Sequence, residues 1–197
     1  METDSTTENS PAAPLSEQHF QELAFATQRA LPVRRAARVA AFNGWITAII
    51  AALSLPFAVT GLIALLVAIG LGVVAFLEFR GRRQLLAFKP EGATLLGWNQ
   101  AGFMTLIIAY CCWMLFSGAT DLDAHPEYAQ LLGAQGRELY RSLVVAFYSA
   151  VIVLTVIFQG GNSLYYFSRR KHVATYLEQT PKWVQDLQQA NSGAMST

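Results

Sequence analysis

Four long apolar stretches constrain the fold of this chain more than any other feature. They cover about residues 39–58, 61–79, 99–117 and 142–167, and charged residues occur only at their ends. An α-helix needs about 20 apolar residues to cross the hydrocarbon core of a bilayer. A soluble fold would have to bury all four stretches around one core, and only 14% of the residues are charged, against roughly 25% in soluble domains. The sequence therefore predicts an all-α integral membrane protein, built as a four-helix bundle.

The lysines and arginines are distributed unevenly over the segments that connect these stretches. Of the 14, four precede the first stretch, four lie between the second and the third, and four follow the fourth. Arg137 and Arg141 share the remaining long loop with four acidic residues. Cytoplasmic loops of membrane proteins carry the excess of Lys and Arg. This distribution predicts that both termini are cytoplasmic, and abundant Ala and Gly with few Lys favour a bacterial inner membrane.

The membrane domain, residues 39–167, is predicted to be preceded by a short amphipathic helix at the membrane surface. Residues 1–14 are polar and are expected to be disordered. In the basic segment 15–38, Ser16 is a typical N-cap residue, and Pro32 is expected to end or bend the helix that follows it. The apolar face of this helix is expected to lie on the membrane or a partner helix, or else on the protein's own cytoplasmic face.

A second amphipathic helix is predicted after the fourth stretch, in the basic segment 168–190. It is expected to begin at Thr180, with Pro181 in its first turn. One of its faces carries three apolar side chains, a pattern that favours contact with lipid headgroups. They are Trp183, Val184 and Leu187. Residues 191–197 are expected to form a disordered tail.

Acidic side chains alternate in the long loop at about residues 118–141. Carboxylate and imidazole groups bind metal ions, and the loop holds Asp121, Asp123, His125 and Glu127. Pro126 interrupts the extended geometry that would place them on one side, so no metal site is predicted here, and no cofactor is predicted elsewhere. Pro126 is instead expected to begin a short helix that Gly133 ends.

Small residues recur every four positions in three of the stretches, a spacing that lets two helices approach closely. They are Ala48 and Ala52, then Ala64, Ala68 and Gly72, then Ser142, Ala146 and Ala150. These faces are predicted to pack the helices against one another.

Every stretch also carries an amide or a carboxyl group near the end that is predicted to be cytoplasmic. The set comprises Asn43, Glu78, Asn99, Gln100, Gln159 and Asn162. A buried amide without a partner costs several kcal/mol in hydrocarbon, roughly as an unsatisfied backbone group does, so these side chains are expected to face inward. They form either a structural hydrogen-bond cluster or a shallow pocket, open to the cytoplasm, that binds a small molecule. Gly160 and Gly161 would let such a ligand approach the backbone.

Basic side chains on the same side form a second candidate surface. It comprises Arg80, Arg82, Arg83, Arg169, Arg170 and Lys171. Anionic lipid headgroups are the expected partner, because each Lys or Arg near such a surface gains about 1 kcal/mol. Nucleic acid would need a larger basic field and is not predicted as a partner.

No set of catalytic residues is visible in the sequence. The acids and histidines are dispersed, and no Gly-rich phosphate loop occurs. Pumps and ion-coupled transporters usually need an ionisable group within a span, and the middle of every stretch lacks one. The predicted function is a non-enzymatic scaffold, assembly factor or accessory subunit, whose partner is another membrane protein or a second copy of the chain. The alternative is a small-molecule or lipid binder or transporter that uses the polar cluster.

Overall fold

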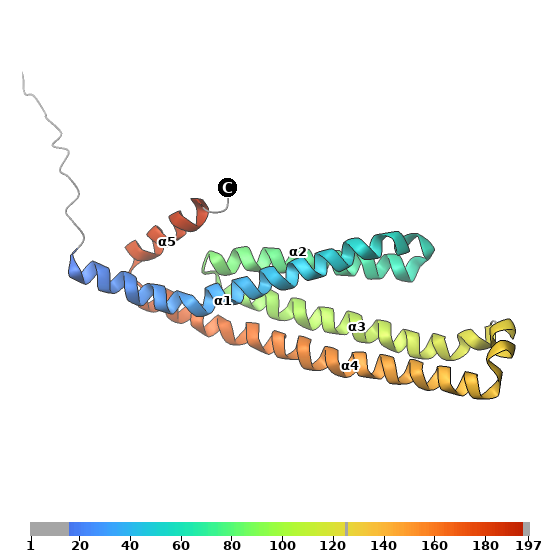
Figure 1. Cartoon of the computed structure of the whole chain (residues 1–197). Helices are drawn as coiled ribbons and strands as arrows, with labels where there is room; N and C mark the ends of the chain where they lie inside the picture. Colours follow the sequence, from blue (N-terminus) through green and yellow to red (C-terminus); the bar gives the residue numbers. More distant parts are fainter. Residues whose placement is uncertain (1–15, 125, 195–197) are drawn as a thin grey trace, which may run out of the picture.

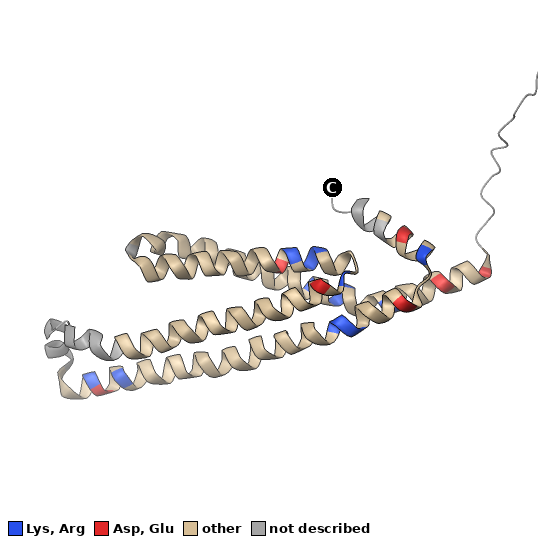
Figure 2. Cartoon of the chain, turned by 180° about the vertical axis from the view of Figure 1, so that it is seen from behind, with Lys and Arg blue, Asp and Glu red and all other residues tan. Residues whose placement is uncertain are grey.

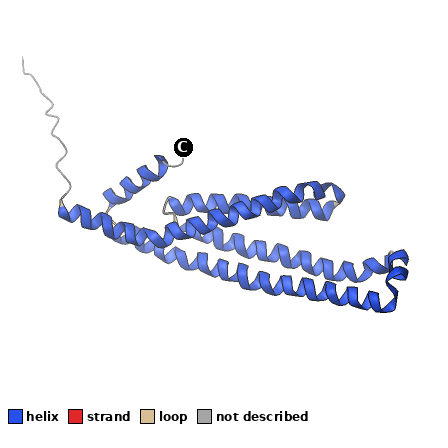
Figure 3. Cartoon of the chain, in the orientation of Figure 1, coloured by secondary structure: helices blue, strands red, loops and turns tan. Residues whose placement is uncertain are grey.

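The structure, a computed structural model, consists almost entirely of helices (Figure 3). It describes residues 16–124 and 126–194. The elements are α1 Glu17–Ser54, the 3-10 helix η1 Leu55–Thr60, α2 Leu62–Leu86, α3 Pro90–Ala124, α4 Pro126–Gln179 and α5 Lys182–Ala194. The helices α1 to α4 are long and apolar enough to cross a membrane, by length and composition. The predicted all-α class and its four long apolar helices are confirmed.

The long helices form two antiparallel hairpins, α1–α2 and α3–α4. α2 packs on α3, and α1 contacts α4, so the two hairpins meet. In Figure 1 they lie close together near the α2–α3 connection and separate toward their far ends. α5 packs against the first turns of α1. The two hairpins are therefore held to each other mainly at one end (Figure 1).

α1 is a single helix of 38 residues that includes Pro32. Its buried seam advances in steps of three and four residues, through Ala26, Ala30, Val33, Ala37, Ala40, Gly44 and Thr47. Such spacing keeps one narrow face of a helix against its neighbours. Because the seam continues on both sides of Pro32, its packing offsets the roughly 3 kcal/mol that a proline costs inside a helix. Of the two expected effects of Pro32, an end or a bend, the end is corrected: α1 continues through Pro32 into the first apolar stretch.

α4 begins at Pro126, and its backbone leaves the helical conformation at Gly133, with φ 64° and ψ −176°. Glycine adopts this positive φ without the steric cost of a Cβ. The helix then continues to Gln179, well past the end of the fourth apolar stretch. The predicted short helix from Pro126 to Gly133 is therefore present, and the helix that follows extends beyond the apolar stretch 142–167 at both ends.

α5 begins at Lys182, close to its predicted start, and extends to Ala194, which lies in the predicted tail. Residues 1–15, His125 and residues 195–197 lie outside the described part of the chain. The expectations for the terminal tails fall partly on these residues. The same holds for the acidic loop, because the side chains of Asp121, Asp123 and Glu127 are also not described.

The most completely buried part of the molecule is the junction, where α1, the α2–α3 connection, the end of α4 and α5 meet. Its buried members are Ala26, Ala30, Val33, Ala36, Ala37, Ala40, Leu85, Phe88, Ala93, Leu96, Tyr166, Val173, Tyr176 and Val184. The ring of Phe88 stacks on that of Tyr176, with centroids 4.0 Å apart. The Tyr176 hydroxyl donates a hydrogen bond to Gln188 of α5 at 3.0 Å. These contacts tie both hairpins and α5 together.

Both amphipathic ends of the chain pack on this junction. The indole N–H of Trp183 donates to the Glu22 carboxylate at 3.1 Å, and the ring of His19 meets the Trp183 ring edge-on. Val184 is fully buried whereas Leu187 is 46% exposed, so the face predicted to touch lipid headgroups packs only partly on the protein itself. On the first half of α1, Ala26, Ala30 and Val33 are covered by the protein's own helices. Phe20 and Leu31 of the predicted apolar face are exposed, so contact of that face with a membrane or a partner helix stays a prediction.

The helices do not pack through all of the predicted rows of small residues. On α2 the buried seam follows Ala68, Leu71, Ala75 and Glu78, whereas Gly72 is exposed. Ala52, Ser142, Ala146 and Ala150 are exposed as well. Small side chains permit close approach but do not determine which face of a helix is covered. The neighbouring helices determine the covered face, which here follows steps of three and four residues.

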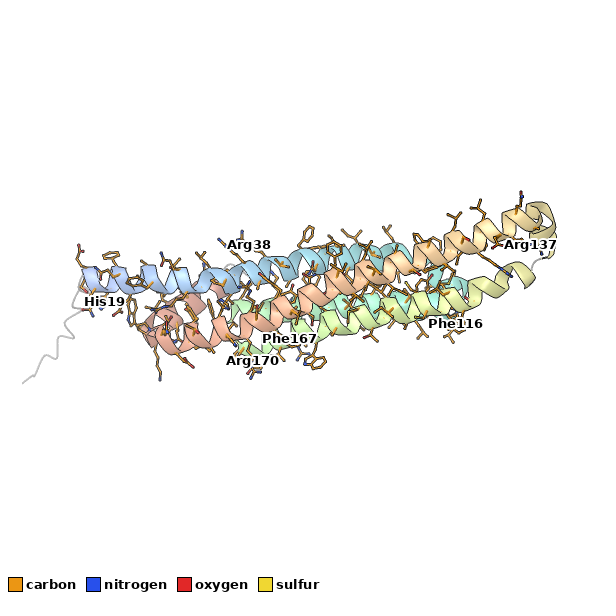
Figure 4. The ribbon with its side chains drawn as sticks, turned by 90° about the horizontal axis from the view of Figure 1, so that it is seen from below. His19, Arg38, Phe116, Arg137, Phe167 and Arg170 are labelled. Carbon is orange, nitrogen blue, oxygen red and sulfur yellow. The ribbon has the colours of Figure 1, made fainter. Side chains whose placement is uncertain are left out.

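Charged residues gather toward the junction end and leave a long uncharged section on every long helix (Figure 2). Figure 4 shows Arg38 and Arg170 at the same level along the bundle, with Arg137 at the opposite end. Beyond this arginine level the hairpins are mostly uncovered. In the most apolar 18-residue segment of each long helix, the chain itself buries only a small part. The buried part is 17% in α1, 28% in α2, 11% in α3 and 6% in α4. The far halves of the hairpins therefore present apolar side chains to their surroundings.

Candidate functional site

Glu78, near the end of α2, is fully buried and forms the centre of the candidate site. Its Oε1 accepts a hydrogen bond from Asn99 Nδ2 at 2.8 Å and another from Gln100 Nε2 at 2.6 Å. Asn99 Nδ2 also donates to the backbone carbonyl of Val74 at 3.1 Å. Asn99 and Gln100 are adjacent on α3, so one turn of α3 reaches a single carboxyl group on α2. We call Glu78, Asn99 and Gln100 the carboxyl–amide cluster.

α1 approaches this cluster through a glycine. A Cβ added at Gly44 would lie 3.2 Å from the Cβ of Glu78, so the missing side chain lets the two helices come close. One residue earlier, Asn43 Nδ2 donates to the hydroxyl of Tyr166 on α4 at 3.5 Å. Tyr166 is fully buried. All four long helices therefore meet at the level of Glu78.

α3 and α4 are joined at the same level by a second set of contacts. The Ser163 hydroxyl donates to the backbone carbonyl of Gly97 at 2.9 Å. A Cβ at Gly97 would lie 2.8 Å from the ring of Phe167, which is labelled in Figure 4. Trp98 meets Phe167 edge-on, with ring centroids 5.9 Å apart. These contacts fix the register of the second hairpin beside the cluster.

Three buried side-chain oxygen atoms near this level have no hydrogen-bond partner. They are Glu78 Oε2, Gln100 Oε1 and Gln159 Oε1. The two amide oxygens are hydrogen-bond acceptors, and so is Glu78 Oε2 when the carboxyl group is ionised. Buried polar atoms are nearly always paired, so each exception in a protein requires an explanation. Two of the three belong to side chains that already bond to each other through their remaining atoms.

The structure places the six predicted polar residues in different ways. Glu78, Asn99 and Gln100 are joined by hydrogen bonds and buried, so they do not line a pocket that is open to solvent. Asn43 bonds to Tyr166 instead. The remaining two, Gln159 and Asn162, are half-buried on α4.

Tyr166 is not among the residues that the sequence predicted for the site, although it is fully buried there and accepts a hydrogen bond from Asn43. One signal was available. Gln159, Asn162 and Tyr166 are spaced by three and four residues, the same step that the buried seams of the helices follow. A polar or amphipathic side chain that continues such a seam is expected to point inward.

The predicted basic surface lies near the level of Glu78. Arg80, Arg83, Arg170 and Lys171 are exposed, and Arg82 and Arg169 are half-buried. The guanidinium carbon of Arg169 lies 4.2 Å from the centre of the Tyr165 ring, a cation–π contact. Exposed guanidinium and ammonium groups at one level are suited to anionic headgroups, and lipid binding there stays a prediction.

The side chains of the site offer hydrogen bonding and charge. Within the described residues, no group of three or more His, Cys, Asp or Glu side chains is placed to hold a metal ion. The carboxyl–amide cluster contains no nucleophile with a neighbouring base.

Comparison with models of protein families, with curated proteins and with solved structures finds no match to this chain.

Proposed function

We propose that this chain is an integral membrane protein with both termini in the cytoplasm, acting as a non-enzymatic scaffold or accessory subunit. The orientation rests on the excess of Lys and Arg around the junction. In this orientation Arg38 and Arg170 lie at the level of the cytoplasmic headgroups. The exposed Trp45 and Trp98 near that level suit an interface, where amphipathic rings are favoured.

The uncovered surface of α4 beyond the arginine level carries the scaffold proposal. Only 6% of its most apolar window is buried by the chain itself. Ser142, Ala146 and Ala150 form an exposed row of small side chains there. At 100° per residue, Ala146 lies opposite the buried Thr155. Small side chains let a second transmembrane helix pack closely, so we assign this row to a helix of a partner, either another membrane protein or a second copy.

Site-specific cross-linking tests this assignment. A photoreactive amino acid at Ala146 is expected to cross-link to protein in the native membrane, with a product of twice the chain mass if the partner is a second copy. The matched control is Phe147, which is 62% exposed on a neighbouring face of the same helix. Cross-linking to protein from Ala146 but not from Phe147 supports the proposal. Lipid adducts alone from both positions contradict it.

The proposed orientation has its own test. Reporter domains fused after Arg83 and after Asp123 are expected to give a cytoplasmic and an external signal, respectively. A cytoplasmic signal from the fusion after Asp123 contradicts the orientation, whatever the result of the cross-linking.

A second candidate function is the binding of a small ligand at the polar cluster. The buried oxygen atoms without a partner favour it, because they lack donors that a ligand would supply. Replacing Asn99 and Gln159 together by Ala is expected to abolish a ligand-dependent property of a protein that still inserts. If the double variant keeps that property, the cluster is not the ligand site.

A further inference from the structure

Glu78 stands apart from the other charged residues of the chain. Among the residues whose burial is described, it is the only Asp, Glu, Lys, Arg or His that is buried. It comes from the first hairpin, and its hydrogen-bond donors, Asn99 and Gln100, come from the second. The cluster is therefore a polar contact between the two hairpins at the end where they converge.

The groups that surround the carboxyl are neutral. α3 contributes the amides of Asn99 and Gln100, and α1 contributes Gly44. α4 contributes Tyr166, whose hydroxyl accepts from Asn43, the residue before Gly44. An ionised carboxylate in this position would be enclosed without a positive charge among its hydrogen-bonding partners. Such a buried charge is strongly unfavourable.

The two unpartnered oxygens of the cluster suggest what completes it. Gln100 uses its nitrogen to donate to Glu78 Oε1, which leaves Gln100 Oε1 and Glu78 Oε2 as buried acceptors on the same pair of side chains. Two acceptors do not bond to each other. A positive charge bound at Glu78 Oε2 would neutralise the carboxylate and supply the partner that this oxygen lacks.

We propose that the carboxyl–amide cluster binds one small monovalent cation, H⁺ or Na⁺, between Glu78 Oε2 and Gln100 Oε1. A proton would reside on Oε2 and donate a hydrogen bond to Gln100 Oε1, and Na⁺ would be coordinated by both oxygens. In either case the cation connects α2 to α3 and so holds the hairpins together. This inference rests on the second candidate function, whose ligand it names, and is independent of the scaffold proposal.

Binding to the folded state alone makes stability depend on the concentration of the cation. Each tenfold rise in free cation near and above its dissociation constant shifts the ratio of folded to unfolded protein by up to about tenfold. If the cation is the proton, stability is therefore lost as the pH rises. Glu78→Gln removes the negative charge and supplies an amide N–H for Gln100 Oε1, so this variant is expected to be independent of the cation.

Denaturant unfolding of the full-length protein in detergent measures this dependence. The pH is varied at constant salt in one series, and NaCl replaces KCl at constant pH in another. A stability that responds to pH alone identifies the proton, and one that rises with NaCl identifies Na⁺. The matched control is Glu91→Gln, at an exposed acid in the first turn of α3, which is expected to keep the wild-type response. A wild-type response that persists unchanged in Glu78→Gln overturns the proposal, as does a wild-type protein that responds to neither ion.

A measurement on the wild-type protein covers the case in which Glu78→Gln fails to fold. A membrane-soluble carbodiimide reacts with protonated carboxyl groups in apolar surroundings, and mass spectrometry locates the adduct. We expect modification at Glu78 and not at Glu91. Modification should slow as the pH rises, and NaCl should slow it further if the bound ion is Na⁺. Absence of modification at Glu78 at every pH overturns the proposal. A larger molecule that co-purifies with the protein, with no response to H⁺ or Na⁺, would support ligand binding in general and refute the cation.

Discussion

The junction and the far halves of the hairpins are built from the same four helices, but their side chains have opposite surroundings. In the junction, Tyr166, Tyr176 and Leu85 are fully buried. In the far halves, Phe116 is 80% exposed and Phe147 is 62% exposed. The alanine seam of α1 lets helices approach closely in the junction, whereas the hairpins separate at the other end (Figure 1). The chain's own packing stabilises one end, and the surroundings must stabilise the other.

The polar contacts follow the same division. Hydrogen bonds between helices that are distant in the chain, from Arg29 to Gln179 and from Trp183 to Glu22, lie in the junction. The far halves expose large apolar side chains, and each square ångström of apolar surface in water costs roughly 25 cal/mol relative to burial. Lipid or a partner helix removes that cost. The comparison therefore separates a region that specifies the fold from a region that is available for interaction.

The largest expected effect contrasts two aromatic residues of α4. Tyr176→Ala removes a ring that stacks on Phe88, and the cavity is expected to cost about 3–5 kcal/mol of unfolding free energy. Phe147→Ala, in the far half, is expected to change it by less than about 1 kcal/mol. Denaturant unfolding in detergent measures both. An equal loss of unfolding free energy from the two substitutions would show that the junction is no more tightly packed than the far halves.

Two glycines are expected to respond with opposite signs. At Gly97 a Cβ would lie 2.8 Å from the Phe167 ring, so Gly97→Ala is expected to destabilise the protein by roughly 1–3 kcal/mol. At Gly72 no atom lies within 4 Å, so Gly72→Ala is expected to stabilise α2 by up to about 1 kcal/mol. The unfolding midpoints of the two variants measure both changes in stability. A stabilising Gly97→Ala would show that α3 and α4 are not in close contact there.

The smallest effect concerns two serines. Ser163→Ala loses the hydrogen bond to the Gly97 carbonyl and is expected to cost about 1 kcal/mol. Ser149→Ala, at an exposed position in the far half of the same helix, is expected to change stability by no more than about 0.5 kcal/mol. The same unfolding experiment resolves the pair. Equal changes in unfolding free energy for the two variants would show that the hydrogen bond of Ser163 does not stabilise the protein.

Local signals in the sequence predict much of this fold. Apolar stretches predict the four long helices, and Pro126 with Gly133 predicts a short helix and its end. The continuity of α1 through Pro32 could not be predicted in this way, because it depends on burial by other helices on both sides of the proline. Small-residue rows misled for a related reason: Gly72 and Ala75 both permit close packing, and only the partner helices decide which is covered.

The candidate site was partly predictable. Alternating helix direction places Glu78, Asn99 and Gln100 at the same level, since they end one apolar stretch and begin the next. The pairing of one carboxyl oxygen with both amides depends on the rotation of α2 and α3, which periodicity alone does not define. The contact between Asn43 and Tyr166 joins the first helix to the fourth, 123 residues apart, and no local pattern indicates such a pairing.

Distances between spin labels in lipid nanodiscs test the difference between the two regions most directly. One label pair replaces Val59 and Phe116 at the far ends of different hairpins, and a second replaces Arg83 and Lys171 near the junction, in a background with Cys111 and Cys112 changed to Ala. All four label sites are exposed. We expect a single narrow distribution for the junction pair, which the chain's own packing holds, and a longer, broader one for the far pair, where the hairpins separate (Figure 1). A short, narrow distribution for the far pair would show a closed four-helix bundle and contradict the account.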